Sequence, residues 1–511
     1  MRYLVLCTDY DGTIATDGRI LPETLLALER LIASGRRLVL VTGRELDDLQ
    51  TVCPRLELFE YVVAENGALL YHPATGAETP LATRPRDSFI AALRERGVAR
   101  ISVGRVIVAT WTPHEMAVLE TIRDLGLELQ VIFNKGAVMI LPAGVNKATG
   151  LAHALEKMGL SAHNAVGVGD AENDHALLAS CECSAAVANA LATLKSAADI
   201  VTTADHGAGV VELIEEMLRD DLASREPRLE RHHVLLGEDD EGREVRVSPY
   251  GENILLVGAP GSGRSTLAAD LMERVAEQGY TFCVIDVEGD YGTIGKAVSL
   301  GSPTRPPAAG EILKLLRGAD KSGVINLSGL PDADRLPFLA AFTPQLAELR
   351  ETSGHPHWVV VDETHHLLPA SLAAGELLPL GNGQSVLHIT ARPNLVAPAI
   401  LQKTSLLVAI GEQAQALIEE FCQASGVTTP PMDPMRLEAG EALAWRPRVA
   451  GEHATDDGPF RLNIATAVKP GSAGRGRSPG SASAGGAGDA GTPRVAGTRA
   501  IPAKRPAGQT D

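Results

Sequence analysis

Short runs of apolar residues recur along the first part of the chain, and each run ends at polar residues. Four of them lie at 3–7, 37–41, 61–64 and 166–169. Runs of this length, apolar on both faces, indicate buried strands of a parallel sheet. Between the first two runs, Pro22, an apolar periodicity of three to four residues and Gly35 predict one helix. Strands that alternate with helices predict a parallel α/β sheet with right-handed crossovers.

The rhythm changes between about residues 84 and 145. The pattern there predicts helices at 87–96 and 113–125, and strands at 101–110, 128–133 and 136–141. The last two strands form a hairpin that turns at residues 134–136. We interpret this segment as a small α+β insertion that serves as a lid over a pocket in the main sheet. The alternative is a structural appendage that does not contact the substrate.

The first apolar run leads into Asp9-Tyr10-Asp11-Gly12-Thr13, which places two carboxylates just beyond the carboxyl end of a strand. Open α/β sheets bind their ligands at this edge. Residues i and i+2 of an extended chain project to the same side, so Asp9 and Asp11 can face one substrate. One carboxylate can attack phosphorus while the other protonates the leaving oxygen. A divalent cation is expected beside the two acids because they repel each other.

Other strand ends carry residues suited to the same chemistry. Thr42, Gly43 and Arg44 follow the second strand, and their hydroxyl and backbone N–H groups suit a phosphate. Lys147 can neutralise the charge of a transferring phosphoryl group. Asp170 and Asp174 can complete an oxygen shell for Mg²⁺.

Taken together, residues 1–218 resemble the haloacid dehalogenase-like phosphatases, in particular the Cof-type class whose cap lies between the second and third motifs. The matching segments are DYDGT at 9–13, VTGR at 41–44, ENGA at 65–68, NK at 146–147 and GDAEND at 169–174. The later segments at 187–190, 194–199 and 207–210 also resemble this class.

The resemblance implies an aspartyl-phosphate mechanism with Asp9 as nucleophile and Asp11 as general acid and base. Thr42 and Lys147 would hold the phosphoryl group, and Arg44 and Asn66 would lie near the leaving group. Gly43 would bind the substrate together with these two residues. Mg²⁺ would be held by Asp9, the Asp11 carbonyl, Asp170 and the pair Asn173 and Asp174. The short cap is most similar to those of phosphoglycolate and sugar-phosphate phosphatases, which implies a small phosphorylated metabolite as substrate.

A second α/β region follows a charged linker at 219–231. A hairpin is predicted at 233–236 and 244–247, and buried strands at 253–257, 281–287, 357–361 and 385–390. The strand at 253–257 runs into GAPGSGRST, which fits the phosphate-binding loop pattern GxxxxGK[ST] except that Arg264 replaces lysine. We expect ATP to bind through the loop residues Gly258, Gly261, Gly263, Arg264, Ser265 and Thr266. Asp362 would hold Mg²⁺ through water, and Glu363 would polarise an attacking water.

Residues 232–465 resemble the HerA/FtsK-like group of P-loop ATPases, on GAPGSGRST, DVEGDY at 286–291, VVVDETHHLLP at 359–369 and ITARP at 389–393. That resemblance implies an alternative reading, in which a DNA-processing or assembly motor that forms rings carries an accessory phosphatase. The arginine at 264 and the acidic composition argue against a motor. A third hypothesis, a nucleic-acid end-healing kinase with a phosphatase, ranks lowest because Asp362 and Glu363 suit water activation better than transfer to a hydroxyl.

Composition limits the other possibilities. A chain of 511 residues requires at least two domains. The formal charge of −18 argues against tight, non-specific binding of nucleic acid. No apolar run reaches the roughly 18 residues that span a bilayer, and the six cysteines are scattered, so we expect a protein of the reducing cytoplasm. Residues 466–511 are rich in Gly, Ala and Pro, carry net positive charge and are expected to be disordered.

Overall fold

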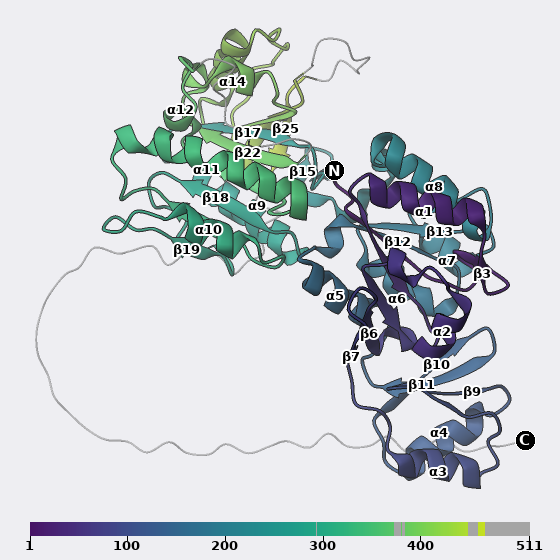
Figure 1. Cartoon of the computed structure of the whole chain (residues 1–511). Coiled ribbons are helices and arrows are strands. Elements are labelled where there is room, and N and C mark those ends of the chain that lie inside the picture. Colours follow the sequence, from purple (N-terminus) through teal and green to yellow (C-terminus); the bar gives the residue numbers. More distant parts are fainter. Residues whose placement is uncertain (293, 373–379, 381–383, 448–457, 465–511) are drawn as a thin grey trace, which may run out of the picture. The chain divides into compact units, whose positions relative to one another are not determined.

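The computed structural model describes residues 1–292, 294–372, 380, 384–447 and 458–464. The expectation of disorder for residues 466–511 therefore lies outside the described residues. The described chain contains two large sheets, a four-stranded sheet and a two-stranded ribbon (Figure 1). No helix among the described residues is long and apolar enough to cross a membrane.

The first large sheet has eight strands in the order β14-β13-β12-β1-β4-β5-β6-β7. Its parallel strands are β1 (Val5–Thr8), β4 (Arg37–Val41), β5 (Tyr61–Ala64), β12 (Ala165–Gly169), β13 (Cys183–Ala186) and β14 (Ile200–Val201). Two strands that the sequence reading missed, β6 (Leu69–His72) and β7 (Ala77–Pro80), extend the sheet as an antiparallel edge. Asn66 and Gly67 have positive φ angles, and the chain reverses there from β5 into β6.

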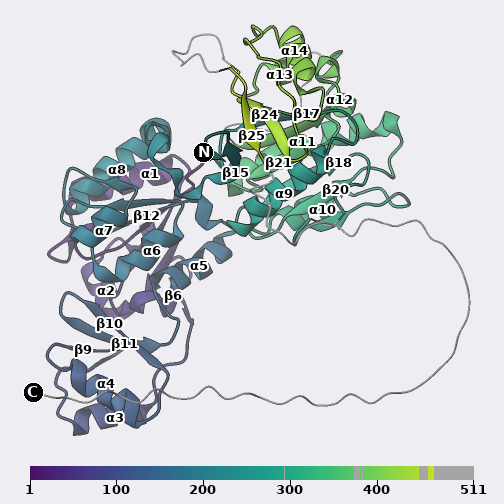
Figure 2. The ribbon, with the colours of Figure 1, turned by 180° about the vertical axis from the view of Figure 1, so that it is seen from behind.

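Helices cover both faces of this sheet because successive strand residues point to opposite sides. Leu6 packs with α1 (Pro22–Ala33) and α8 (His206–Asp220), whereas Val5 and Cys7 pack with α5 (Lys147–Met158) and α6 (His175–Ser180). Both ribbon views show α1 and α8 side by side (Figures 1 and 2). Two further helices of this region are α2 (Leu46–Val52) and α7 (Ala192–Ala197). The strands β2 (Ala15–Thr16) and β3 (Arg19–Ile20) pair as the two-stranded antiparallel ribbon.

The insertion between β7 and α5 forms the small α+β body that the sequence predicts. Its sheet has the order β10-β11-β9-β8, with β8 (Ser102–Val103), β9 (Val108–Trp111), β10 (Leu129–Asn134) and β11 (Ala137–Pro142), and its helices are α3 (Asp87–Glu95) and α4 (Glu115–Asp124). The single strand expected at 101–110 is divided in two. The reason is Glu65, which accepts hydrogen bonds from the backbone N–H groups of Arg105, Val106 and Ile107, so these groups are not free for a strand ladder.

The second large sheet has eleven strands in the order β16-β15-β25-β24-β23-β17-β22-β21-β18-β20-β19. Seven are parallel, namely β17 (Asn253–Gly258), β18 (Phe282–Asp286), β19 (Val298–Leu300), β20 (Gly323–Asn326), β21 (Trp358–Val361), β22 (Ser385–Thr390) and β23 (Leu406–Ile410). The predicted hairpin is present as β15 (Val234–Asp239) and β16 (Glu244–Val247). The strands β24 (Glu441–Trp445) and β25 (Phe460–Asn463) continue the sheet antiparallel, and the sequence reading did not foresee them.

Helices again cover the faces of this sheet. They are α9 (Arg264–Glu277), α10 (Ala309–Leu316), α11 (Asp332–Ser353), α12 (Thr364–Leu367), α13 (Pro398–Leu401) and α14 (Ala414–Ser425). The apolar stripe of α9 packs on β17, β18, β21 and β22, while α14 packs on the opposite face of β17 and β23. Consequently the loop from β17 to α9 lies at the carboxyl edge of a buried parallel sheet, where open α/β sheets bind ligands.

Candidate functional sites

The first site lies where the order of the first sheet reverses. Strand β1 pairs with β4 on one side and with β12 on the other, so the chain leaves β1 in opposite directions. Asp9 follows β1, Thr42 follows β4 and Asp170 follows β12, which brings these three residues to one crevice. Crevices of this kind are the usual ligand sites of open α/β sheets.

Lys147 is the centre of charge in this crevice. Its Nζ lies 2.5 Å from Asp9 Oδ1 and 2.6 Å from Asp174 Oδ1, and its side chain is 1% exposed. The lysine is the first residue of α5, and a capping box between Asn146 and Thr149 starts the helix there. A buried ammonium is tolerated only with partners of opposite charge, so the position of Lys147 depends on both acids.

The buried carboxylates of the crevice outnumber the buried positive charge of Lys147, and this imbalance shifts their pKa values. Burial lowers the pKa of Lys147, but Asp174 and Asp9 outweigh this effect and raise it, so the lysine is charged. Burial raises the pKa of Asp9 to about 7 despite Lys147, and the charges of Asp174 and Asp170 add to the rise. Burial also raises the pKa of Asp170. A further cation would relieve this repulsion.

Asp9, Asp170 and Asp174 each offer a carboxylate oxygen within 4.8 Å of the others, and this donor set fits a hard cation such as Mg²⁺. Asp174 is the most occupied of the three, because its Oδ2 accepts from the N–H groups of Asp170 and Ala171 and its Oδ1 accepts from Lys147. Asp9 and Asp170 are therefore the freer ligands. Thr13, which lies 3.4 Å from Asp9 Oδ2 and 3.2 Å from Asp170 Oδ1, orients both.

Arg44 is paired with the carboxylate of Asp11. Its Nε lies 2.6 Å from Asp11 Oδ2 and its Nη2 lies 2.7 Å from Asp11 Oδ1, a bidentate pair, and its Nη1 contacts Asp48. Thr42 Oγ1 accepts a hydrogen bond from the backbone N–H of Arg44, which fixes the turn after β4. A bidentate arginine fixes a carboxylate in one orientation, so Arg44 orients Asp11 in this structure.

Asn66, which is expected near the leaving group, and Gly43 both lie beside Asn173, which is expected as a metal ligand. Asn173 Nδ2 donates to Asn66 Oδ1 at 2.9 Å, and Asn173 Nδ2 also lies next to Gly43. Asn66 Nδ2 and Asn173 Oδ1 are buried without a hydrogen-bond partner. Buried polar groups are nearly always paired, so these two atoms suit a bound ligand.

Sequence reasoning missed three residues of this site. Thr13 lay inside the DYDGT segment but received no role, and Glu65 lay inside ENGA. Lys135 lies at the turn between β10 and β11, and its Nζ donates to Asp11 O at 2.8 Å and to Asp170 Oδ2 at 2.9 Å. The only signal for Lys135 in the sequence was its place at the turn of a hairpin in the insertion.

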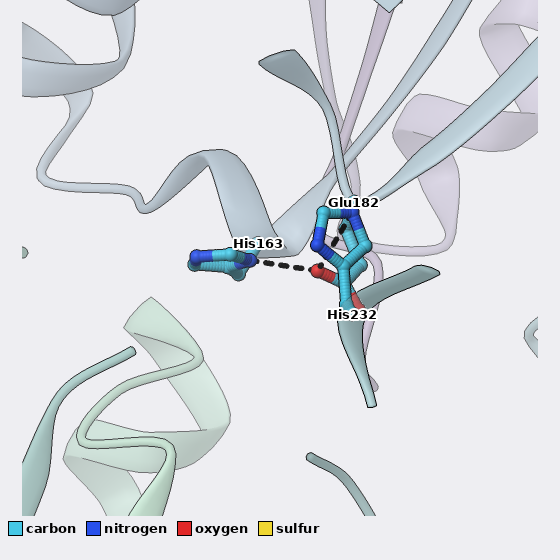
Figure 3. Close-up of side chains that lie close together, drawn as sticks. All are labelled: His163, Glu182 and His232. Atoms are coloured by element: carbon cyan, nitrogen blue, oxygen red, sulfur yellow. Dashed lines mark hydrogen bonds and ion pairs between the residues drawn. The ribbon is translucent and has the colours of Figure 1, made fainter. Parts of the chain in front are cut away.

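A second polar cluster joins His163, Glu182 and His232 (Figure 3). His163 Nδ1 lies 2.7 Å from Glu182 Oε2, and His232 Nε2 lies 3.8 Å from the same oxygen. Arg2 and Tyr280 also donate to Glu182. Burial alone would raise the pKa of Glu182, but His163 and Arg2 lower it, so the carboxylate is charged and well supplied with donors. We therefore interpret this cluster as a buried ion-pair network. Cys181 and Cys183, which flank Glu182 in the sequence, are buried free thiols.

The loop between β17 and α9 lines a cavity of about 660 Å³. Gly261 and Gly263 have positive φ angles, which residues with a side chain rarely adopt, and Ser265 and Thr266 begin α9. Gly258 ends β17, where an added Cβ would lie 2.4 Å from Ser262 Oγ. The expected residues Gly261, Gly263, Arg264, Ser265, Thr266 and Glu363 all line the cavity.

Arg264 and Glu363 form an ion pair across this cavity. Arg264 Nη2 lies 2.7 Å from Glu363 Oε1, and each side chain is 10% exposed. Arg264 Nη1 and Ser262 Oγ are buried without a hydrogen-bond partner. Asp362 lies beside them, and burial, together with the charge of Glu363, raises its pKa to about 7. Arg392 also lines the cavity.

The comparisons with known proteins concern the first of these regions. The family model of haloacid dehalogenase-like hydrolases matches residues 6–111 and 119–214. Phosphoglycolate phosphatase 2 of Saccharolobus solfataricus is 29% identical over 42% of this chain and 92% of its own length. Phosphoglycolate phosphatase of Pyrobaculum aerophilum is 32% identical over 43% of this chain and 97% of its own length. A solved haloacid dehalogenase-like hydrolase of Bacteroides thetaiotaomicron is 19% identical, covers 42% of this chain and 99% of its own, and has a TM-score of 0.37.

The matched residues include the crevice with its acids and lysine, and the relatives are covered over nearly their whole length. The chain therefore belongs to the haloacid dehalogenase-like hydrolases, and its first region is a phosphatase that acts on phosphoric monoesters.

Proposed function

We propose that residues 1–218 form a magnesium-dependent phosphatase domain that hydrolyses a small phosphorylated metabolite through an aspartyl-phosphate on Asp9. The observation that carries this proposal is the buried contact of Lys147 with Asp9 and Asp174 at the meeting point of three strand ends. Among possible substrates, 2-phosphoglycolate is favoured by the names of the relatives, and a sugar phosphate is the second choice.

In the first step, a carboxylate oxygen of Asp9 attacks phosphorus and the bond from phosphorus to the ester oxygen breaks. Asp11 donates its proton to the departing alkoxide, and Arg44 keeps Asp11 in position. In the second step, Asp11 takes a proton from water as that water attacks the aspartyl-phosphate, which frees Asp9 and inorganic phosphate. Lys147 and Thr42 hold the phosphoryl oxygens, and Asn66 and Gly43 lie beside the departing alcohol.

Asp9, the carbonyl of Asp11, and Asp170 would hold Mg²⁺ directly. Asp174 and Asn173 would complete the site beside these ligands. The ion would neutralise negative charge on the acids and on the phosphoryl group. The chain's own contribution is the fixed position of the acids: Thr13 holds Asp9 and Asp170, and Lys147 holds Asp9 and Asp174.

The test is release of inorganic phosphate from 2-phosphoglycolate and from a panel of sugar phosphates with Mg²⁺ present. The Asp9→Asn variant keeps the shape of the side chain but cannot form the ester, so we expect a loss of about 10⁴-fold or more. Undiminished turnover in Asp9→Asn would refute the proposed nucleophile. The matched control is Asp17→Asn, a change in the loop between β2 and β3 outside the crevice, which should leave the rate unchanged.

For residues 232–465 we propose a P-loop domain that binds ATP with Mg²⁺. Support comes from the glycine-rich loop between β17 and α9, the cavity it lines, and Asp362 and Glu363 at the end of β21. The loop would wrap the phosphates with its N–H groups, Ser265 would ligate Mg²⁺, and Asp362 would hold it through water. Binding of a fluorescent ATP analogue that Arg264→Ala abolishes would support this proposal, and unchanged binding in the variant would refute it.

The alternative, a HerA/FtsK-like ATPase that processes DNA or drives assembly, makes the second region primary. It predicts oligomeric rings and ATP hydrolysis that DNA stimulates. A monomer whose ATP hydrolysis ignores DNA would exclude it. The phosphatase remains our first proposal because its parts are complete, whereas the second region departs from its pattern at Arg264.

A further inference from the structure

The hairpin tip of the insertion reaches into the phosphatase crevice. Strands β10 and β11 are joined by Lys135 and Gly136, which both have positive φ angles, 47° and 86°. Positive φ angles at both central residues are typical of the type I′ turn of a tight hairpin. The Nζ of Lys135 lies 2.8 Å from the carbonyl oxygen of Asp11 and 2.9 Å from Asp170 Oδ2.

These two oxygens are the ones that we assign above to Mg²⁺. The ammonium of Lys135 therefore neutralises the acids in the place that a metal ion would take. Two cations cannot share these oxygens, so binding of Mg²⁺ would displace the lysine. Its side chain is half-exposed and flexible, which lets its ammonium group turn toward the substrate instead.

The other basic groups near the crevice are already engaged. Lys147 is held by Asp9 and Asp174, and Arg44 is held by Asp11 and Asp48. Among the described basic side chains that contact these acids, Lys135 is the one that the metal ion would release. It is thus placed to meet a second negative charge on the substrate.

The surroundings of the tip suit a small polar leaving group. Asn134, the residue before Lys135, lies near Gly43, and its Nδ2 would be 3.9 Å from a Cβ added to that glycine. Asn134 Oδ1, Asn66 Nδ2 and Asn173 Oδ1 are buried and have no hydrogen-bond partner. The Nζ of Lys135 lies 2.9 Å from Asp170 Oδ2, so the hairpin tip of the insertion lies directly beside the acids of the crevice.

We infer that Lys135 is a specificity-determining residue that binds a carboxylate on the alcohol part of the substrate. The substrate class is then the phosphate ester of a short hydroxy acid, rather than that of a neutral sugar. This inference rests on the proposed phosphatase function and deepens it, because it names the residue and the charge that select the substrate. A charge-assisted hydrogen bond of this kind changes binding by roughly 10- to 100-fold.

The experiment compares 2-phosphoglycolate with 2-hydroxyethyl phosphate, a neutral ester of nearly equal size. Lys135→Met keeps the length of the side chain and removes its charge. We expect kcat/KM for 2-phosphoglycolate to fall about 30-fold, mostly through KM, while that for 2-hydroxyethyl phosphate changes less than about 3-fold. Lys135→Arg should restore part of the preference, and Lys157→Met, an exposed lysine on α5, is the matched control. An equal loss for both esters would overturn the inference.

A binding measurement separates this inference from the proposed function. In the Asp9→Asn background, calorimetry should show that Lys135→Met weakens the binding of 2-phosphoglycolate by a similar factor. The affinity for 2-hydroxyethyl phosphate should not change. Lys135→Met should also bind Mg²⁺ more tightly, about 3- to 10-fold, because the competing ammonium is gone. If the wild-type protein hydrolysed neither ester, the proposed function would fail, and the two binding measurements would still decide on Lys135. Equal affinities with and without the lysine would refute its role.

Discussion

The two large sheets of this protein use the same principle and differ in how they hold positive charge. In both, acids and a basic residue meet at the carboxyl edge of parallel strands. Lys147 is almost fully buried between two carboxylates, whereas Arg264 is paired with the single carboxylate of Glu363. Both sites carry further acids, namely Asp170 beside the lysine and Asp362 beside the arginine. The two sites differ in that Lys147 is shared by two carboxylates, whereas Arg264 pairs with one.

The difference follows from the two side chains. An ammonium is a compact charge that donates hydrogen bonds in several directions, so one lysine can pair with two carboxylates. A guanidinium is a planar fork that binds one carboxylate or phosphate well. If the second region binds a phosphate as proposed, that phosphate would compete with Glu363 for Arg264. In the first region a phosphoryl group would meet a lysine that the acids have already positioned.

The largest effect that would sharpen this comparison is expected for Lys147→Met. The variant leaves Asp9 and Asp174 buried without their common counter-charge, which should cost about 3–5 kcal/mol of stability and at least about 10³-fold in phosphatase rate. Urea denaturation and phosphate release measure the two effects. A variant as stable and as active as Lys157→Met would show that the buried lysine does not organise the site.

The next largest effect is the change in the stability of each region as the pH falls, measured in the absence of a metal ion. Burial lowers the pKa of His388, on β22, to about 4 from 6.5. Its folded pKa is depressed, so its contribution to stability is present above pH 6.5 and is lost as the pH falls toward 4, about 3 kcal/mol in all. Asp9 has the opposite sign, because its folded pKa is raised: its contribution is greatest below pH 3.8 and is lost as the pH rises through about 7.

Urea denaturation followed by hydrogen-exchange mass spectrometry at pH 7.5 and pH 5 reads both regions in one sample. The peptides of β22 should become less stable at pH 5, and those of β1 should change less or gain stability in the presence of a chelator. In His388→Leu the loss at β22 should shrink. An unchanged pH slope in that variant would contradict the assignment to His388.

The smallest of these effects concerns the ion pair between Arg264 and Glu363. Glu363→Gln should free Arg264 for a phosphate and tighten a non-hydrolysable ATP analogue by roughly 10-fold, the gain from one charge-assisted contact. Equilibrium binding of a fluorescent analogue measures it. Glu348→Gln, an exposed acid on α11, serves as the control. If Glu363→Gln bound the analogue more weakly than the wild-type protein, Glu363 would not be competing with the phosphate for Arg264.

Much of the local structure could be predicted from the sequence. Four buried strands of each large sheet, the helix after Pro22, the hairpin of β15 and β16 and the loop before α9 occur where periodicity, proline and glycine place them. The motif residues could also be named, because Asp9, Lys147 and Asp170 each stand at the end of a strand or the start of a helix. The antiparallel strands β6, β7, β24 and β25 were missed, and so were the parallel strands β13, β14, β19, β20 and β23. Segments this short carry no periodic signal that separates a strand from a loop.

The sequence by itself determined which segments form strands and helices and which side chains carry charge, because hydrophobic period and backbone preference act over a few residues. Only the tertiary structure decided which of those charges meet. Lys147 reaches Asp9 across 138 positions of the chain, and Lys135 reaches Asp170 from a separate hairpin. Such contacts depend on strand order and on how the insertion closes, and both are set by the packing of apolar faces far from the charged residues themselves.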